Sequence, residues 1–124
     1  MTRIGLRFKR TTDELFFSYA YIGDTAPNVV SVYFDKDLDS EYAVDPDYNF
    51  IVTFNGVSIP IIYIIMDIGG DRKRVALGLD PSGAAGLTGD HVGLVTYRRG
   101  ALALAGLNGE VVGEFTNKPI VNIL

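Results

Sequence analysis

The chain has 124 residues, of which 48% are hydrophobic and 11% aromatic, and it contains no cysteine. A chain this long and this apolar does not match the composition of a disordered protein, and we expect one domain spanning residues 1–124. The lack of cysteine excludes disulfides, thiolate metal sites and cysteine nucleophiles. The net charge of −4 argues against nucleic acid as a partner, because nucleic-acid binding needs a positively charged surface.

The sequence also argues against a membrane partner. Its longest apolar run, Ile59–Met66, is far shorter than the roughly 20 residues that span a bilayer. The basic stretch at residues 1–10 is not followed by the apolar segment of an export signal. We therefore expect a virion location if the protein is viral and a cytoplasmic location otherwise.

The first half of the chain alternates between strand and turn patterns. At the start, Ile4, Leu6 and Phe8 alternate with basic residues, which predicts a half-buried strand with a basic outer face. Further runs of aromatic and β-branched residues predict strands at Glu14–Ile22, Val29–Phe34 and Asn49–Phe54. Asn55-Gly56 then predicts a tight hairpin turn.

The second half continues in the same way. Val57–Ile68 is apolar on both faces and is weakened as a strand by Pro60, and a turn follows at residues 69–71. Strands are also predicted at Lys73–Leu79, His91–Tyr97, Ala101–Leu107, Val111–Phe115 and Ile120–Leu124, with Pro81–Asp90 as the least structured stretch. Ala101–Leu107 is also compatible with a short helix. The pattern predicts an all-β fold, an antiparallel sandwich or barrel of about nine short strands.

The acidic stretch at residues 35–47 is the first candidate site. It begins with the Asp-x-Asp-x-Asp spacing of an EF-hand loop, but Ser40 and Pro46 stand where that loop needs glycine and glutamate. A looser calcium site between strands remains possible because calcium binds clusters of carboxylate oxygens, and the alternative is a solvated acidic loop. The candidate ligands are Asp35, Asp37, Asp39 and Glu41.

Two features of the sequence predict a protein interface. The basic residues at the start of the chain and the acidic stretch are complementary in charge, within one subunit or between copies. The run at residues 59–66 is apolar on both faces, as in a strand covered on both sides or a strand that contacts a partner. The candidate interface residues are Ile59, Ile61, Ile62, Tyr63, Ile64, Ile65, Met66, Arg3, Arg7 and Lys9.

Catalytic patterns are weak in this sequence. His91 is the single histidine, and the adjacent Asp90 would point to the opposite face of a strand. Ser82 lacks the Gly-x-Ser-x-Gly motif of a nucleophile elbow. We therefore expect no enzymatic activity and no cofactor.

The hypothesis that accounts for most of these features is a structural or assembly module. It would act as a homo-oligomer or as a subunit of a larger particle with other structural proteins, most concretely a virion component such as a capsid decoration or tail protein. The choice of a virion rests on analogy with other small β domains. The alternative is a small β-sandwich that binds carbohydrate, or a ligand with the help of calcium. The residues that would form a sugar-binding surface are Tyr19, Tyr21, Tyr33, Tyr42 and Tyr48.

Overall fold

The computed structural model describes residues 14–39, 49–99 and 104–124. These residues form two β-sheets and one short helix. In chain order the elements are β1 (Glu14–Leu15), β2 (Phe17–Gly23), β3 (Ala26–Phe34), β4 (Phe50–Phe54), β5 (Val57–Ile59), β6 (Ile61–Ile68), β7 (Asp71–Leu79), α2 (Pro81–Ala84), β8 (Gly93–Tyr97), β9 (Val111–Val112) and β10 (Phe115–Ile123).

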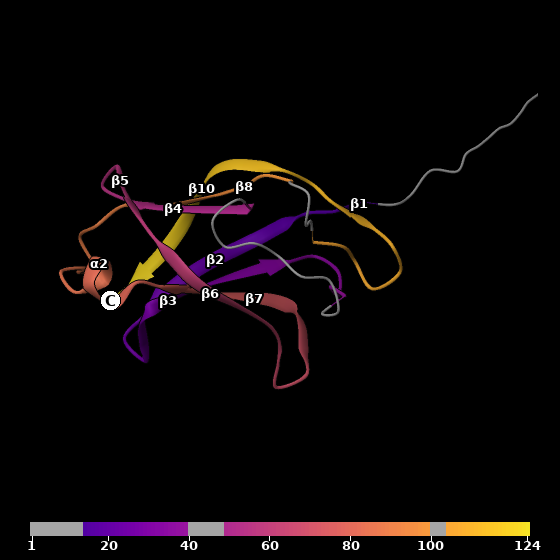
Figure 1. Cartoon of the computed structure of the whole chain (residues 1–124), viewed down its shortest axis with the longest axis horizontal. Helices are drawn as coiled ribbons and strands as arrows, with labels where there is room; N and C mark the ends of the chain where they lie inside the picture. Colours follow the sequence, from indigo (N-terminus) through magenta and orange to yellow (C-terminus); the bar gives the residue numbers. More distant parts are fainter. Residues whose placement is uncertain (1–13, 40–48, 100–103) are drawn as a thin grey trace, which may run out of the picture.

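The larger sheet has eight strands in the order β5-β4-β8-β10-β2-β3-β7-β6. It folds over itself into two layers, one made of β5, β4, β8 and β10 and the other of β2, β3, β7 and β6 (Figure 1). Neighbouring strands are antiparallel except for β10 and β2, which run parallel where the two layers join. This strand order is that of an immunoglobulin-type sandwich, with β2, β3, β7 and β6 in one sheet and β4, β8 and β10 in the other. The short strands β1 and β9 form a separate parallel pair.

Pro60 lies where the chain crosses from one layer to the other. The strand before it, β5, is one edge of the larger sheet, and the strand after it, β6, is the other edge. Because proline has no N–H to donate to a neighbouring strand, it is tolerated at such a break and would be costly inside a central strand. The apolar run predicted as one strand is therefore two edge strands in different layers.

Two tight turns have the backbone that their residues predict. Asn55 and Gly56 have φ values of 50° and 80°, and they join β4 to β5 as the type I′ hairpin requires. Gly69 and Gly70 have φ values of 60° and 85° and join β6 to β7. The hairpin predicted at Asn55-Gly56 is confirmed.

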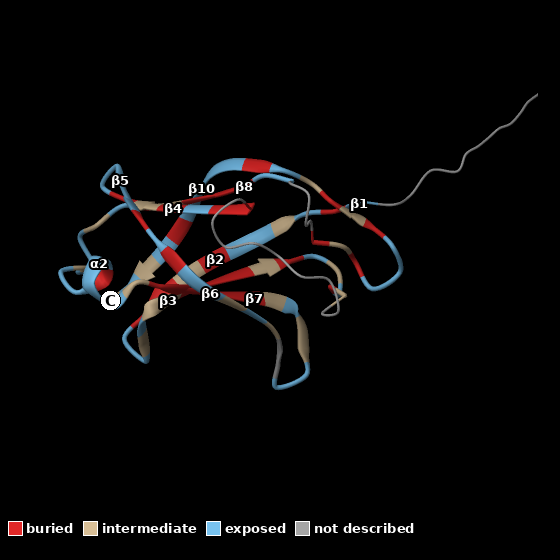
Figure 2. Ribbon diagram, in the orientation of Figure 1, coloured by how far each residue is buried: buried red, intermediate tan, exposed pale blue. Residues whose placement is uncertain are grey.

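The core lies between the two layers, and Figure 2 shows buried residues on strands of both. Alternate residues of each strand point inward, as with Val30, Val32 and Phe34 of β3. Tyr97 is fully buried at the end of β8, and its hydroxyl oxygen accepts a hydrogen bond of 3.1 Å from the backbone N–H of Leu104. The buried phenol therefore has a partner, as burial of a polar group requires.

The predicted all-β sandwich or barrel is confirmed, and further differences concern details. Two strand pairs are parallel, which a single sequence does not reveal. The stretch predicted as least structured contains the one-turn helix α2, where Asp80 caps the N-terminus by accepting from the Ser82 N–H. In the described part of the stretch predicted at Ala101–Leu107, Ala105 and Gly106 form isolated bridges rather than a helix or a full strand. The strand predicted at Ile4–Lys9 lies outside the described residues.

Candidate functional site

The structure separates the predicted interface residues of the run 59–66 into inward and outward sets. Ile59 and Ile61 are buried in the core. Ile62, Tyr63 and Ile65 are exposed, and two further residues of the set, Ile64 and Met66, are half-buried at the rim of the core. A register shift between Ile61 and Tyr63 places two consecutive residues in the exposed set.

The outward residues of β6 belong to a larger apolar surface. Strand register places Tyr63 opposite Gly78, Ile65 opposite Ala76, and the same face continues across β7, β3, β2 and β10. We call this surface the outer face. It comprises Tyr63, Ile65, Arg74, Ala76, Gly78, Val29, Ser31, Tyr33, Tyr19, Tyr21, Val121 and Ile123.

The outer face is apolar and largely uncharged. Arg74 is the charged residue in this set, and its Nε–H donates a hydrogen bond of 3.1 Å to the Ser31 hydroxyl. Tyr19, Ile65, Val121 and other large apolar side chains of the set are exposed, while small residues such as Ala76 lie buried beneath them. Natural sheets that face water usually carry polar side chains on that side, so a surface of this composition indicates a contact surface.

Three tyrosines form a stack at the centre of the outer face. The rings of Tyr19 and Tyr33 are 4.6 Å apart between centroids and nearly parallel at 8°. Tyr21 lies beside both, with centroids 6.4 Å from Tyr19 and 6.2 Å from Tyr33. Burial raises the pKa of Tyr33, the phenols of Tyr21 and Tyr19 raise it further, and the Arg74 guanidinium partly offsets them. The other two tyrosines proposed for sugar binding, at positions 42 and 48, lie outside the described residues.

Sequence reasoning identified the tyrosines and the β6 residues separately but did not bring them together. It did not identify Val121 and Ile123 as members of this surface. The signal in the sequence was the apolar stretch at residues 120–124. In the structure, Val121 and Ile123 of this stretch are exposed on β10 and alternate with less exposed residues. Their position beside β2 depends on the parallel β10–β2 pairing.

The acidic candidates for a calcium site are placed by backbone contacts. Asp35 accepts a hydrogen bond of 2.8 Å from the Phe16 N–H, and its own N–H donates to the Phe16 carbonyl. Leu38 is buried, and its N–H donates to the Arg72 carbonyl. Within the three described segments, no group of three or more acidic or histidine side chains is placed to hold a metal ion. Another candidate, Glu41, lies outside these segments.

His91 belongs to a hydrogen-bonded loop at the end of the sandwich near α2. Its Nδ1 accepts a hydrogen bond of 3.0 Å from the Thr88 N–H. The amide of Asn122 donates to the carbonyl oxygens of Thr88 and His91, at 2.8 and 2.9 Å. Ser82, the hydroxyl considered with His91, instead donates to the Asp80 carboxylate. These contacts tie the loop before β8 to the end of β10.

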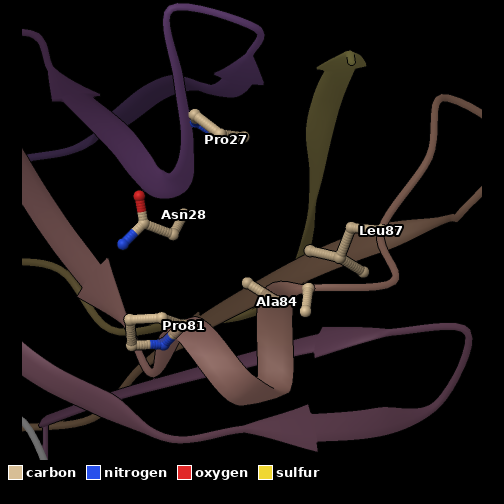
Figure 3. A pocket seen from close by; sticks show the side chains of 6 residues that line it. Pro27, Asn28, Pro81, Ala84 and Leu87 are labelled. Carbon is tan, nitrogen blue, oxygen red and sulfur yellow. The ribbon is translucent and has the colours of Figure 1, made fainter.

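An apolar pocket lies beside this loop, next to α2 (Figure 3). Its volume is about 340 Å³, and its lining residues are Pro27, Asn28, Pro81, Ala84, Ala85 and Leu87. None of these side chains titrates near neutral pH, so this pocket offers no group for acid–base chemistry. A second hollow of about 250 Å³ is also lined by Leu87 and includes His91 among its lining residues.

The basic interface candidates Arg3, Arg7 and Lys9 lie outside the described residues. In the part of the chain that is described, no helix has the length and hydropathy needed to cross a lipid bilayer.

Comparison with known proteins shows similarity of fold. No protein-family model matches the chain, and no curated protein matches it. Among solved structures, a crystal structure of the N-terminal part of the bacterial S-layer protein SbsC matches 89% of this chain with a TM-score of 0.65 and 16% identity. A structure of domains 1–6 of the surface layer protein SbsC matches 86% of the chain with a TM-score of 0.63 and 18% identity.

A crystal structure of the S-layer protein rSbsC matches 90% of the chain with a TM-score of 0.60 and 18% identity. The chain spans 24%, 13% and 14% of the lengths of these three structures, in the order given. The likeness shows that this sandwich resembles parts of much longer surface-layer chains.

Proposed function

We propose that this protein is a structural module that self-assembles, and that copies of it meet through the outer face. The observation that carries the proposal is the continuous apolar and aromatic surface that runs from β6 to β10, in which the residues of the set include Arg74 and no acidic residue. Protein interfaces are enriched in tyrosine and arginine and depleted in lysine and acidic residues, which is the composition of this surface. The fold shared with parts of a surface-layer protein supports an assembly role.

The composition of the outer face is compatible with a second copy as the partner. Each copy has a net charge of −4, so two copies repel one another at long range. Contact through the residues of the outer face, none of which is acidic, keeps acidic groups out of the interface, where like charges would be costly. The virion component expected from the sequence draws no support from the surface-layer likeness and stays a prediction.

One pair of variants tests this proposal directly. Ile65 on the outer face and Ile51 on β4 are the same residue type, exposed to 49% and 46%. We expect Ile65→Lys to weaken association by about tenfold or more, because it places an ammonium group within the apolar contact. Ile51→Lys, on the other layer, should leave association unchanged. Light scattering on both variants measures the effect, and equal loss in both, or in neither, would contradict the proposal.

The sugar-binding alternative keeps one supporting observation, the tyrosine stack. The ring faces of Tyr19 and Tyr33 that contact each other are covered, so a sugar would have to stack on the outer faces of the group. A titration of the protein with oligosaccharides, followed by tyrosine fluorescence, separates the two functions. A saturable change that Tyr19→Ala abolishes would favour sugar binding over assembly.

A further inference from the structure

The edge of β6 is the feature that carries a further inference, which rests on the proposed self-assembly. In the described part of the chain, β6 pairs with β7 alone, so its other edge presents backbone N–H and C=O groups without a strand neighbour. The opposite edge of the sheet, β5, has only three residues and ends at Pro60. β6 is therefore the longer of the two acceptor edges.

This edge has little of the protection that sheet edges usually carry. Exposed edges are commonly guarded by lysine, by proline or by bulges. β6 contains neither lysine nor proline, and its one charged residue, Asp67, and its register shifts lie near its two ends. The regular part between them, Tyr63–Met66, has apolar side chains on both faces, exposed Tyr63 and Ile65 on one and half-buried Ile64 and Met66 on the other. A strand that pairs here gains apolar contacts on either side.

A segment of the same chain fits this edge in pattern. Residues 4–9 alternate between apolar and small or basic side chains, with Ile4, Leu6 and Phe8 on one face. This period of two is the pattern of a strand, and such a strand pairs with a sheet edge through main-chain hydrogen bonds while its alternate side chains contact the surface. The segment brings apolar residues for whichever face of β6 it covers.

The net charges favour contact between this segment and another copy, without selecting the β6 edge. The first ten residues contain four basic residues and no acidic residue. The remaining residues contain seven basic and fifteen acidic residues, a net charge of −8. Residues 3–9 contain three of these basic residues, so this segment is attracted to the remainder of another copy even though whole copies repel one another.

We propose that residues 3–9 of one copy add as a strand to the β6 edge of a second copy. Each copy would then donate one strand and accept one, a head-to-tail contact that can extend along an array or close into a ring. The outer face would continue onto the donated strand.

Disulfide cross-linking tests this arrangement cleanly because the chain has no cysteine of its own. One chain carries Ile65→Cys, and a second chain with a mass tag carries either Leu6→Cys or Arg7→Cys. Successive side chains of a strand point to opposite faces, so we expect the covalent heterodimer yields of the two donors to differ by about fivefold or more. The matched acceptor Ile51→Cys should give background yield with both donors. Raised salt should reduce the larger yield.

Four outcomes would overturn the inference. Equal yields for the two donors would show that the N-terminal segment contacts the other copy without pairing as a strand. Equal yields for the two acceptors would show that the contact does not involve the β6 edge. A lack of cross-links while wild-type chain forms oligomers in light scattering would reject strand donation and leave the proposed assembly intact. A cross-link within dilute chains that carry both Leu6→Cys and Ile65→Cys would place the segment on its own β6. By contrast, a wild-type chain that stays monomeric would remove the proposed assembly itself.

Discussion

The ring of Tyr63 lies against the backbone of Gly78 in the neighbouring strand. A Cβ atom at position 78 would overlap the ring. Strand register places the two residues opposite each other on the outer face. The glycine thus provides the space in which an aromatic side chain lies flat on the sheet, and the ring covers the backbone that the glycine leaves bare. This contact fixes part of the surface through which we propose that copies meet.

The contact predicts that Gly78→Ala is destabilising. The added methyl group forces the Tyr63 ring away from the sheet, and overpacking of this kind costs about 1–3 kcal/mol. Urea denaturation of the variant measures the change in the free energy of unfolding. The control is Gly78→Ala in a Tyr63→Ala background, where the methyl group has room. If the substitution costs as much in that background, the ring is not the cause.

The hydrogen bond to Tyr97 predicts a second loss of stability. In Tyr97→Phe the buried N–H of Leu104 loses its acceptor, which costs about 1–2 kcal/mol in the free energy of unfolding. Tyr19→Phe is the matched control, because Tyr19 is 46% exposed and its ring stack is unchanged by the substitution. Thermal and urea unfolding of both variants should show a loss for position 97 alone. Equal stability of Tyr97→Phe and wild type would contradict the role of the hydroxyl.

Alkaline pH should destabilise the fold, in part through the same tyrosine. Burial raises the pKa of Tyr97 above its ordinary value of 10.0, although the hydrogen bond from Leu104 and the nearby Arg99 lower it. Above pH 10 the folded state therefore holds more protons than the unfolded chain, and the free energy of unfolding falls as pH rises. The stabilising contribution is fully present below pH 10.

The measurement is the slope of unfolding free energy against pH on the alkaline side. The pKa of Tyr33 is also raised, so wild type should lose stability through both residues. Tyr97→Phe removes one of the two titrating groups and should have a shallower slope, whatever its stability at neutral pH. An unchanged slope would show that Tyr97 ionises equally in both states.

Asn122 predicts a local effect at the end of the sandwich. Its side-chain N–H groups donate hydrogen bonds to two backbone carbonyl oxygens of the loop before β8. Its side-chain carbonyl oxygen accepts a hydrogen bond from the Leu124 N–H. Asn122→Ala should cost about 1–2 kcal/mol and increase amide hydrogen exchange at Leu124 and in the loop at residues 88–92. Asn122→Asp keeps an acceptor for Leu124 but places a carboxylate beside the two carbonyl oxygens, so it should not rescue the loop. Rescue by aspartate would show that the donor side of the amide is unimportant.

The sequence predicted the fold class and the main turns because these depend on local patterns. Runs of β-branched and aromatic residues identify strands such as β3, and the Asn55-Gly56 pair favours positive φ at both positions. The crossing at Pro60 was less visible, since a proline in an apolar run indicates a break without indicating which layer the next strand joins. The parallel β10–β2 pair depends on contacts between residues about 100 positions apart, which no local pattern encodes.

The outer face was predictable only in part, because local patterns show which stretches are apolar but not which side chains face outward. The run at residues 59–66 is conspicuous, but which of its side chains face outward depends on the register shift after Ile61. The contacts of the acidic stretch were also not evident from the sequence. The sequence did not single out Leu38 in this stretch, although it is buried and its N–H donates to the Arg72 carbonyl of β7; the calcium site stays a prediction.

The central claim is that the protein self-assembles, and its solution mass tests this most directly. Light scattering on the wild-type chain should be recorded over a wide range of protein concentration at low and high salt. We predict a mass greater than one chain that persists on dilution, and weaker association of the Ile65→Lys variant. A mass of one chain, 13.5 kDa, at every concentration would contradict the account.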